Sequence, residues 1–398
     1  MISDALRRLA TSIFVALPYQ VADRIHPWRR RAFRDTSVTT VASDRCTLLI
    51  GPVNSAGQGY AWARAAEHLP GVTAVNLMYR SSSDRFSFPA DHSVDSAVAS
   101  GVRRWQNAEK AAILKSFTHV IVESGAHLFD THAPVLHHLL RMKDADVEVA
   151  LLFHGSDIRS PRAHAQTEAD SPFRDGQYED TSLLESIASR NRVLIEAAGL
   201  PVFVSTPDLL LDVPEATWLP VAVRPELWSA GATQVALERR RPIVVHAPSR
   251  AGLKGSTLIE ETVRRLHDEG VIEYREVRGV PSSEMPRVYG ESDVVLDQFS
   301  LGIYGVAACE AMAAGRLVIS HVSDFVRREV RKRTGLDLPI VEATASNLES
   351  VLRRVADSPS EYAAVTSAGA EFVRTVHDGS RSADALRAFL HRSETTVE

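Results

Sequence analysis

Short apolar runs alternate with helical segments along most of this 398-residue chain, and this alternation limits the folds available to it. In the first half, a predicted helix lies between one apolar run and the next, and each run is short enough to be a buried strand. These predicted strands cover residues 47–50, 72–78, 117–122, 147–153 and 201–204. Strands that alternate with helices are typical of a parallel sheet covered by helices on both faces. We therefore predict an α/β fold.

The alternation restarts after a proline-punctuated connector, TWLPVAVRPELW, at residues 217–228. A chain of this length exceeds one ordinary core. We therefore predict two Rossmann-like domains facing a cleft, residues 1–222 and 223–380, with an amphipathic C-terminal helix in residues 381–398 that packs back on the first domain. The predicted strands of the second series cover residues 242–246, 271–277, 294–296, 317–319 and 338–341.

Charge and cysteine content narrow the choice of partner and compartment. The net charge of −5 gives a nucleic-acid partner no global electrostatic support, so we expect none. The two cysteines, Cys46 and Cys309, lie in apolar contexts, which fits a reducing compartment and offers no metal cluster. No segment is long enough to span a bilayer, and a cytoplasmic protein is expected.

The N-terminal segment allows two interpretations. Residues 9–22 are uncharged but short, and Pro18 interrupts them. Arg7 and Arg8 precede this run, as in a signal peptide, but there is no convincing small-residue cleavage site, so we do not expect one. Basic and aromatic residues then gather in residues 26–34. They could form an interfacial helix that makes a peripheral contact with the inner membrane face. We favour the simpler interpretation, in which this helix packs on the first domain and exposes a solvated basic turn.

Residues 294–319, VVLDQFSLGIYGVAACEAMAAGRLVI, combine a strand, a loop with glycines and the start of a helix. Backbone N–H groups at such a helix start can hold an anion such as a diphosphate, and Gly305 lets the backbone come close. Glu310, one turn further in, could accept hydrogen bonds from a sugar diol. Asp297 and Gln298 follow the strand directly and are further candidates for polar contacts with a ligand, although Asp297 could instead cap a turn.

A second signal is the stretch HAPSRAGLKGS at residues 246–256, which carries Arg250 and Lys254 between a strand and a helix. Lysine is scarce in this chain, with only five residues, so a lysine in a glycine-containing loop stands out. Two cations beside a helix start suit a diphosphate. The glycine spacing is not that of a P-loop. The predicted donor-binding set also includes Ser249 and Tyr304, which belong to these two stretches.

Together, HAPSRAGLKGS and GIYGVAACEAMAAG resemble the retaining glycosyltransferases of the GT-B fold, of the family 4 type, and VSTPDLL and VHDG support the likeness. The resemblance implies that Arg250 and Lys254 hold the donor diphosphate and that Glu310 binds the nucleotide ribose. It implies transfer from a nucleotide sugar with retention of anomeric configuration, usually without a metal. The family typically has a second glutamate eight positions before the ribose-binding one. In this chain that position, eight residues before Glu310, is Gly302.

The first half of the chain contributes further candidates. The resemblance implies that the loop with Asn54, Gly57 and Gly59 faces the donor or acceptor, and that His154 lies near the donor sugar and phosphate. His154 could also be a core histidine. Asp157 follows in the same loop and could pair with Arg159. No histidine or aspartate cluster has ligand spacing, so neither a metal nor a cofactor is expected.

We therefore expect a retaining hexosyltransferase in which Arg250, Lys254 and His154 act on a UDP- or GDP-linked sugar. The acceptor is left open among a glycan, a lipid and a small molecule. Two alternatives remain: a non-catalytic GT-B module that binds a nucleotide or a partner, with Gly302 marking lost catalysis, and a nucleotide-sugar epimerase of similar fold.

Overall fold

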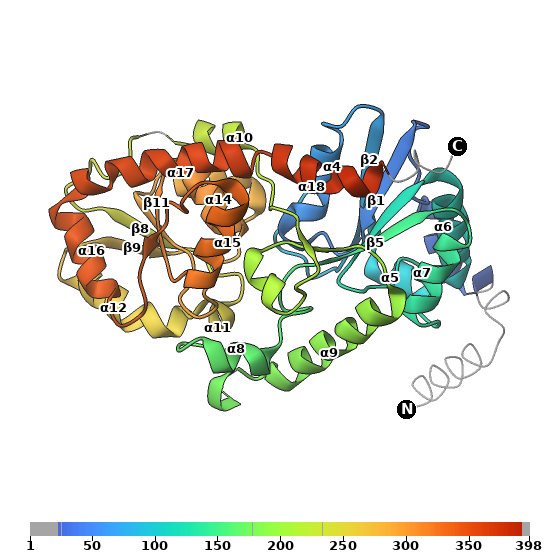
Figure 1. Cartoon of the computed structure of the whole chain (residues 1–398), viewed down its shortest axis with the longest axis horizontal. Helices are drawn as coiled ribbons and strands as arrows, with labels where there is room; N and C mark the ends of the chain where they lie inside the picture. Colours follow the sequence, from blue (N-terminus) through green and yellow to red (C-terminus); the bar gives the residue numbers. More distant parts are fainter. Residues whose placement is uncertain (1–22, 25, 177, 233, 392–398) are drawn as a thin grey trace.

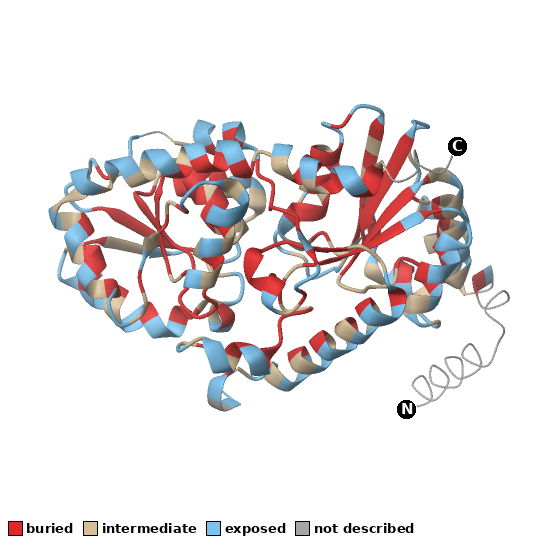
Figure 2. Ribbon diagram, in the orientation of Figure 1, coloured by how far each residue is buried: buried red, intermediate tan, exposed pale blue. Residues whose placement is uncertain are grey.

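The computed structural model describes residues 23–24, 26–176, 178–232 and 234–391, and it contains two parallel sheets, each covered by helices (Figure 1). The uncharged run and the arginines at the very N-terminus lie outside the described residues. Parallel strands buried on both faces explain why the strand sequences are continuous apolar runs rather than alternating ones. Figure 2 shows this burial in the strands of both sheets.

The first sheet has seven strands in the order β3-β2-β1-β4-β5-β6-β7, all parallel. The two edge strands of this sheet, β3 and β7, were not predicted, because they are short and partly polar. The strands are β1 (Cys46–Gly51), β2 (Val72–Arg80), β3 (His92–Asp95), β4 (His119–Glu123), β5 (Glu148–Phe153), β6 (Val202–Val204) and β7 (Thr217–Trp218). The helices are α3 (Pro27–Asp35), α4 (Gln58–Ala66), α5 (Ser96–Gly101), α6 (Arg103–Ser116), α7 (Val135–Lys143), α8 (Pro161–Thr167) and α9 (Thr181–Ala198).

The second sheet has five parallel strands in the order β12-β11-β10-β8-β9. The strand predicted at residues 338–341 is displaced and reduced to two residues. The strands are β8 (Ile243–His246), β9 (Glu273–Glu276), β10 (Val294–Leu296), β11 (Leu317–Ser320) and β12 (Val341–Glu342). The helices are α10 (Pro225–Ala230), α11 (Ala251–Lys254), α12 (Ser256–Asp268), α13 (Met285–Gly290), α14 (Val306–Ala313), α15 (Asp324–Thr334), α16 (Leu348–Asp357), α17 (Ala363–Val376) and α18 (Ser380–Leu390).

The chain's last two described helices connect the domains. Helix α17 covers the second sheet, and α18 continues from it across to α4 of the first domain (Figure 1). Phe389 of α18 packs edge-on against His119 and Phe203, with ring centroids 5.2 and 6.1 Å away. One apolar cluster therefore runs through both domains and includes Trp62 and Phe372.

The basic N-terminal helix α3 packs on the first domain. The guanidinium of Arg104 lies 4.0 Å from the centroid of the Phe33 ring, and Trp28 lies beside Gly101 of α5. Trp28 is nevertheless 44% exposed, and Arg30 and Arg31 of the same helix are also exposed. Among the residues that the structure describes, no helix is both long and apolar enough to cross a bilayer.

Candidate donor site between the two domains

The two motifs of the second domain meet because their strands are neighbours. Strands β8 and β10 pair in parallel, with His246 opposite Leu296, so both end at the same edge of the sheet. The loops that follow, residues 247–250 and 297–305, therefore lie side by side. Ligands of open α/β sheets bind beyond this edge. Arg250, Lys254 and Glu310 are brought together by this register.

His246, which was not among the predicted site residues, fixes the end of β8. Its Nδ1 lies 2.8 Å from the Leu296 carbonyl oxygen and its Nε2 lies 2.7 Å from Ser256 Oγ. Burial lowers the pKa of His246 to about 4, so the ring is neutral at physiological pH. It ties β8, β10 and the start of α12 together beneath the site.

A cavity of ≈ 680 Å³ lies between the domains at this edge. Most of the predicted site residues line it, from both domains. They are His154, Ser249, Arg250, Lys254, Asp297, Gln298, Gly305 and Glu310. We call this the donor cavity. Its volume is within the range of small-molecule sites.

Lys254 and Asp297 form an ion pair inside the donor cavity, with Lys254 Nζ 2.7 Å from Asp297 Oδ1. The Asp297 side chain is 1% exposed, and its second oxygen, Oδ2, is buried without a hydrogen-bond partner among the described residues. Asp297 was expected either to contact the ligand or to cap a turn. No backbone N–H group of the described residues donates to its side chain, so the turn-capping role has no hydrogen bond to support it. Gln298 instead orders the loop, because its Nε2 donates to the Ile303 carbonyl oxygen at 3.1 Å.

The start of helix α14 opens into the donor cavity. Gly305 is its N-cap in an extended conformation, and a Cβ added there would meet no atom within 4 Å. Val306 and Ala307 of the first turn also line the cavity. The first backbone N–H groups of a helix have no partner within the helix, so this end is suited to an anion.

Glu310 lies one turn further along α14 and lines the same cavity. Burial raises the pKa of Glu310 to about 8; the charge of Lys254 opposes this rise and that of Asp297 adds to it. With its pKa at about 8, the carboxyl group is largely protonated at pH 7 and can donate one hydrogen bond as well as accept others.

In the first domain, His154 ends β5 and lines the donor cavity. Its Nε2 lies 3.0 Å from Glu123 Oε1, and its ring stacks on Trp62 at 5.6 Å between centroids. Burial opposes the charged form, but the hydrogen bond and charge of Glu123 outweigh it and raise the pKa of His154. Glu123 is fixed in turn by the N–H groups of Val53 and Asn54, each 2.8 Å away.

The loop of residues 54–59 builds the wall behind this histidine. Asn54, Gly57 and Gly59 do not line the donor cavity, whereas their neighbours Ser55 and Ala56 do. Asn54 is 1% exposed and holds the Pro89 carbonyl oxygen. Gly59 is required by packing, because a Cβ there would lie 2.5 Å from Asn76 Nδ2.

Two residues, Asp157 and Tyr304, do not make the contacts expected of them. Asp157 does not pair with Arg159; it accepts the N–H groups of His154 and Gly155, and Arg159 pairs with Asp208 at 2.6 Å. Asp157 therefore shapes the loop and lies outside the donor cavity. Tyr304 also lies outside it: its ring is 2% exposed, and its hydroxyl is 3.3 Å from His377 Nε2.

Gly302 faces the other domain rather than the donor cavity. Its φ is +63°, and a Cβ built there would lie 2.9 Å from the carboxyl carbon of Glu168. Glu168 Oε2 is 3.0 Å from His321 Nε2, and His321 Nδ1 is 2.7 Å from Glu342 Oε1. Hydrogen bonds to Glu168 and Glu342 raise the pKa of His321 to about 9. Position 302 is thus part of a domain contact.

Several residues that line the donor cavity were not predicted from the sequence. Phe86 and Phe88 stack at 5.8 Å in a polar loop of the first domain and line the donor cavity together with Arg85. The Ser282 N–H of the second domain donates to the Phe86 carbonyl oxygen at 3.0 Å. Two phenylalanines in the polar stretch SSSDRFSFP were the available sign.

Three solved structures illustrate which proteins have a similar fold. A sucrose-phosphate synthase from Thermosynechococcus elongatus is 12% identical, with a TM-score of 0.54 over 89% of this chain and 100% of that one. Anabaena Alr3699/HepE, solved with UDP and glucose, is 10% identical, with a TM-score of 0.53 over 87% and 99%. An alpha-glucosyltransferase solved with UDP and a DNA 13-mer is 10% identical, with a TM-score of 0.58 over 88% and 100%.

These similarities show that the chain has the two-domain GT-B fold, which confirms the predicted fold class. No protein-family model and no curated protein sequence matches the chain.

Proposed function

We propose that this protein is a retaining glycosyltransferase that moves a sugar from a nucleotide-diphosphate sugar, UDP- or GDP-linked, to a hydroxyl acceptor. The observation that carries the proposal is the convergence of Arg250, Lys254 and the open start of α14 on one cavity between two GT-B domains. Neighbours of the same fold solved with UDP support a nucleotide sugar as the donor.

In the proposed complex, the diphosphate lies between Arg250, Lys254 and the first N–H groups of α14. These groups stabilise the negative charge that develops on the leaving phosphate. Lys254 is already positioned by Asp297. Glu310, carrying its proton, faces the ribose diol and exchanges hydrogen bonds with it. Because these groups supply the charge stabilisation, the proposed transfer needs no metal or cofactor.

The proposed transfer proceeds without a carboxylate nucleophile. Glu123 is occupied by His154 and two backbone N–H groups, and Asp157 by backbone N–H groups. We infer front-face attack: the bond from the anomeric carbon to the phosphate oxygen breaks, and a bond to the acceptor oxygen forms. The acceptor's proton passes to the departing phosphate. His154 faces the donor sugar and phosphate from the first domain.

The test is nucleotide release from a panel of UDP- and GDP-sugars, paired with thermal shifts for UDP and GDP. We expect one nucleotide to stabilise the protein and one donor to be turned over. Lys254→Ala should lower both nucleotide binding and turnover at least tenfold, and unchanged values would contradict the assignment. Tight binding without turnover of any donor would instead favour a non-catalytic module, and donor conversion without an acceptor would favour an epimerase.

A further inference from the structure

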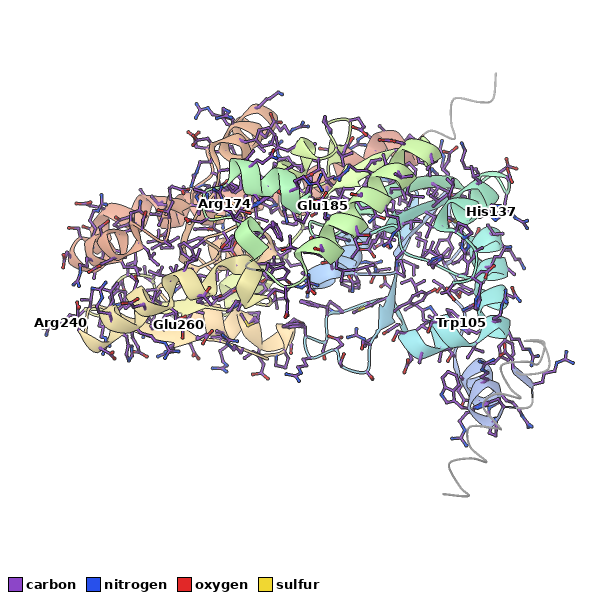
Figure 3. The ribbon with its side chains drawn as sticks, turned by 90° about the horizontal axis from the view of Figure 1, so that it is seen from below. Trp105, His137, Arg174, Glu185, Arg240 and Glu260 are labelled. Atoms are coloured by element: carbon purple, nitrogen blue, oxygen red, sulfur yellow. The ribbon has the colours of Figure 1, made fainter. Side chains whose placement is uncertain are left out.

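A second cavity opens from the donor cavity and follows one face of α9. Its volume is ≈ 890 Å³, and it shares Ser55, His154, Ser156 and Arg250 with the donor cavity. We call it the α9 groove. In the view from below, α9, on which Glu185 is labelled, runs from the region of Arg174 toward α7, on which His137 is labelled (Figure 3). The α9 groove therefore leads away from the reaction centre along the first domain.

The α9 groove has an aliphatic side, and polar residues such as Ser124, His127 and Asp157 line the rest of it. One face of α9 contributes Leu184, Ile187, Leu194 and Ala197 at helical spacing, and the start of α7 contributes Val135 and Leu136. No Phe, Tyr or Trp is among the described lining residues. The hydroxyl groups of a glycan would find no hydrogen-bond partners on the aliphatic side, and burying them there costs free energy. An aliphatic chain gains free energy from the same contact.

The groove has an order along α9. At its inner end, Leu184 packs with Leu253 and Leu301 of the second domain, which also line the donor cavity. In the middle, Asn191 Nδ2 donates to the Asp157 carbonyl oxygen at 2.8 Å, and Arg190 lines the groove beside it. At the outer end, Leu194 and Ala197 lie on the next turns of the helix.

Arg190 places a positive charge between the reaction centre and the aliphatic outer section. It has no carboxylate partner among the residues that the structure describes. Arg190 is exposed at the groove, where its charge is suited to an anionic group of the ligand, and the arginine fork matches a phosphate or a carboxylate.

We propose that the α9 groove binds the acceptor and that this acceptor is an anionic amphiphile. Its hydroxyl group lies beside His154, a phosphate-type group beside Arg190, and an aliphatic chain along the outer end of the groove. This inference rests on the proposed transferase function for its acceptor role. A membrane lipid and a soluble acyl metabolite share this chemistry.

The binding test titrates the full chain with inorganic phosphate and with butyl, octyl and dodecyl phosphate, below their micelle concentrations, by calorimetry. Affinity should rise by about threefold for each added methylene until the groove is filled. Inorganic phosphate binding as tightly as octyl phosphate would overturn the proposal. So would displacement of octyl phosphate by a soluble oligosaccharide of higher affinity.

Two variants of helix α9 test where the aliphatic chain of the ligand binds. Leu194→Glu puts a charge into the α9 groove and should lower octyl phosphate affinity at least tenfold. Leu183→Glu makes the same change at a side chain that is 57% exposed and outside the groove, and should leave affinity unchanged. Equal losses in the two variants would contradict the assignment. UDP thermal shifts of both variants report that the fold and donor cavity are intact.

Arg190→Gln separates the head group from the chain. It should lower octyl phosphate affinity about fivefold or more and leave the neutral octyl glucoside unaffected. An equal effect on both ligands would overturn the anionic part. Sedimentation with phosphatidylglycerol vesicles then distinguishes the two sources: co-sedimentation supports a lipid, and its absence with octyl phosphate still bound supports a soluble amphiphile.

Failure of this inference and of the proposed function give different results. If UDP binds normally but alkyl phosphate affinity does not depend on chain length, the amphiphilic acceptor is ruled out and the proposed donor site stands. Groove binding of octyl phosphate with no nucleotide binding removes the transferase and, with it, the acceptor role of the groove.

Discussion

Lys254 Nζ lies 2.7 Å from Asp297 Oδ1, and the second oxygen of Asp297 is buried without a hydrogen-bond partner among the described residues. The two residues follow neighbouring strands. The pair therefore holds a cation at the cavity wall before any ligand arrives. A buried carboxylate without its lysine is costly, which makes the relationship testable by stability as well as by binding.

Lys254→Met should lower the free energy of unfolding by about 2–3 kcal/mol at pH 7, because Asp297 is left charged and buried. Lys254→Met with Asp297→Asn should recover most of this loss but not nucleotide binding. Urea denaturation and UDP thermal shifts measure the two effects. Lys332→Met, at an exposed surface lysine, is the control. Recovery of UDP binding in the double variant would show that Lys254 does not contact the diphosphate.

Glu310 should give the protein a pH-dependent stability. Its pKa is raised from 4.5 to about 8 in the folded state, so the folded state binds the extra proton. Its contribution to stability is complete below about pH 4.5 and is lost as the pH rises through about 8. We expect the unfolding free energy to fall by at least about 1 kcal/mol more in the wild type than in Glu310→Gln between pH 6 and 8. Parallel curves would contradict the raised pKa of Glu310.

The Glu168–His321 contact should stabilise the domain contact in a defined pH window. The pKa of His321 is raised to about 9, so its contribution is complete below about pH 6.5 and lost through about pH 9. The pKa of Glu168 is lowered by its hydrogen bond to His321, so its contribution is lost as the pH falls below about 4.5. His321→Gln should cost about 1 kcal/mol at pH 6 and little at pH 10, in urea unfolding curves.

A double-mutant cycle of His321→Gln with Glu168→Gln tests whether these two residues act as a pair. The two changes should be non-additive at pH 6 and additive at pH 10. Additive effects at both values would show that the contact adds no stability.

Placing a glutamate at position 302, as in the family that the sequence resembles, should harm the protein. Gly302 has a positive φ, and Glu168 occupies the space of a side chain. Gly302→Ala should lower the unfolding free energy by at least about 1 kcal/mol, and Gly302→Glu by more, because it adds a like charge beside Glu168. Thermal unfolding and donor turnover measure this. A gain in turnover for Gly302→Glu would show that the position faces the donor after all.

The sequence predicted the parts of the site that follow from strand order. Arg250 and Glu310 each follow an apolar run, and a parallel sheet puts the ends of such runs at one edge. Contacts set by packing between distant segments gave no local signal. Glu168, Gly302 and His321 meet only because the segment after β5 reaches the second domain. Strand β3 was missed because only one of its four residues is buried.

Chain crossings between the domains have a mechanical consequence. The polypeptide passes from one domain to the other near Val223 and returns after His377. The Val223 N–H donates to the His377 carbonyl oxygen at 2.8 Å, and His377 Nδ1 lies 2.7 Å from the Val221 carbonyl oxygen. The two crossings are thus fastened together like the leaves of a door hinge. We therefore expect any opening of the cleft to pivot at these crossings and to break the hydrogen bond from the Ser282 N–H to the Phe86 carbonyl oxygen, which also joins the two domains.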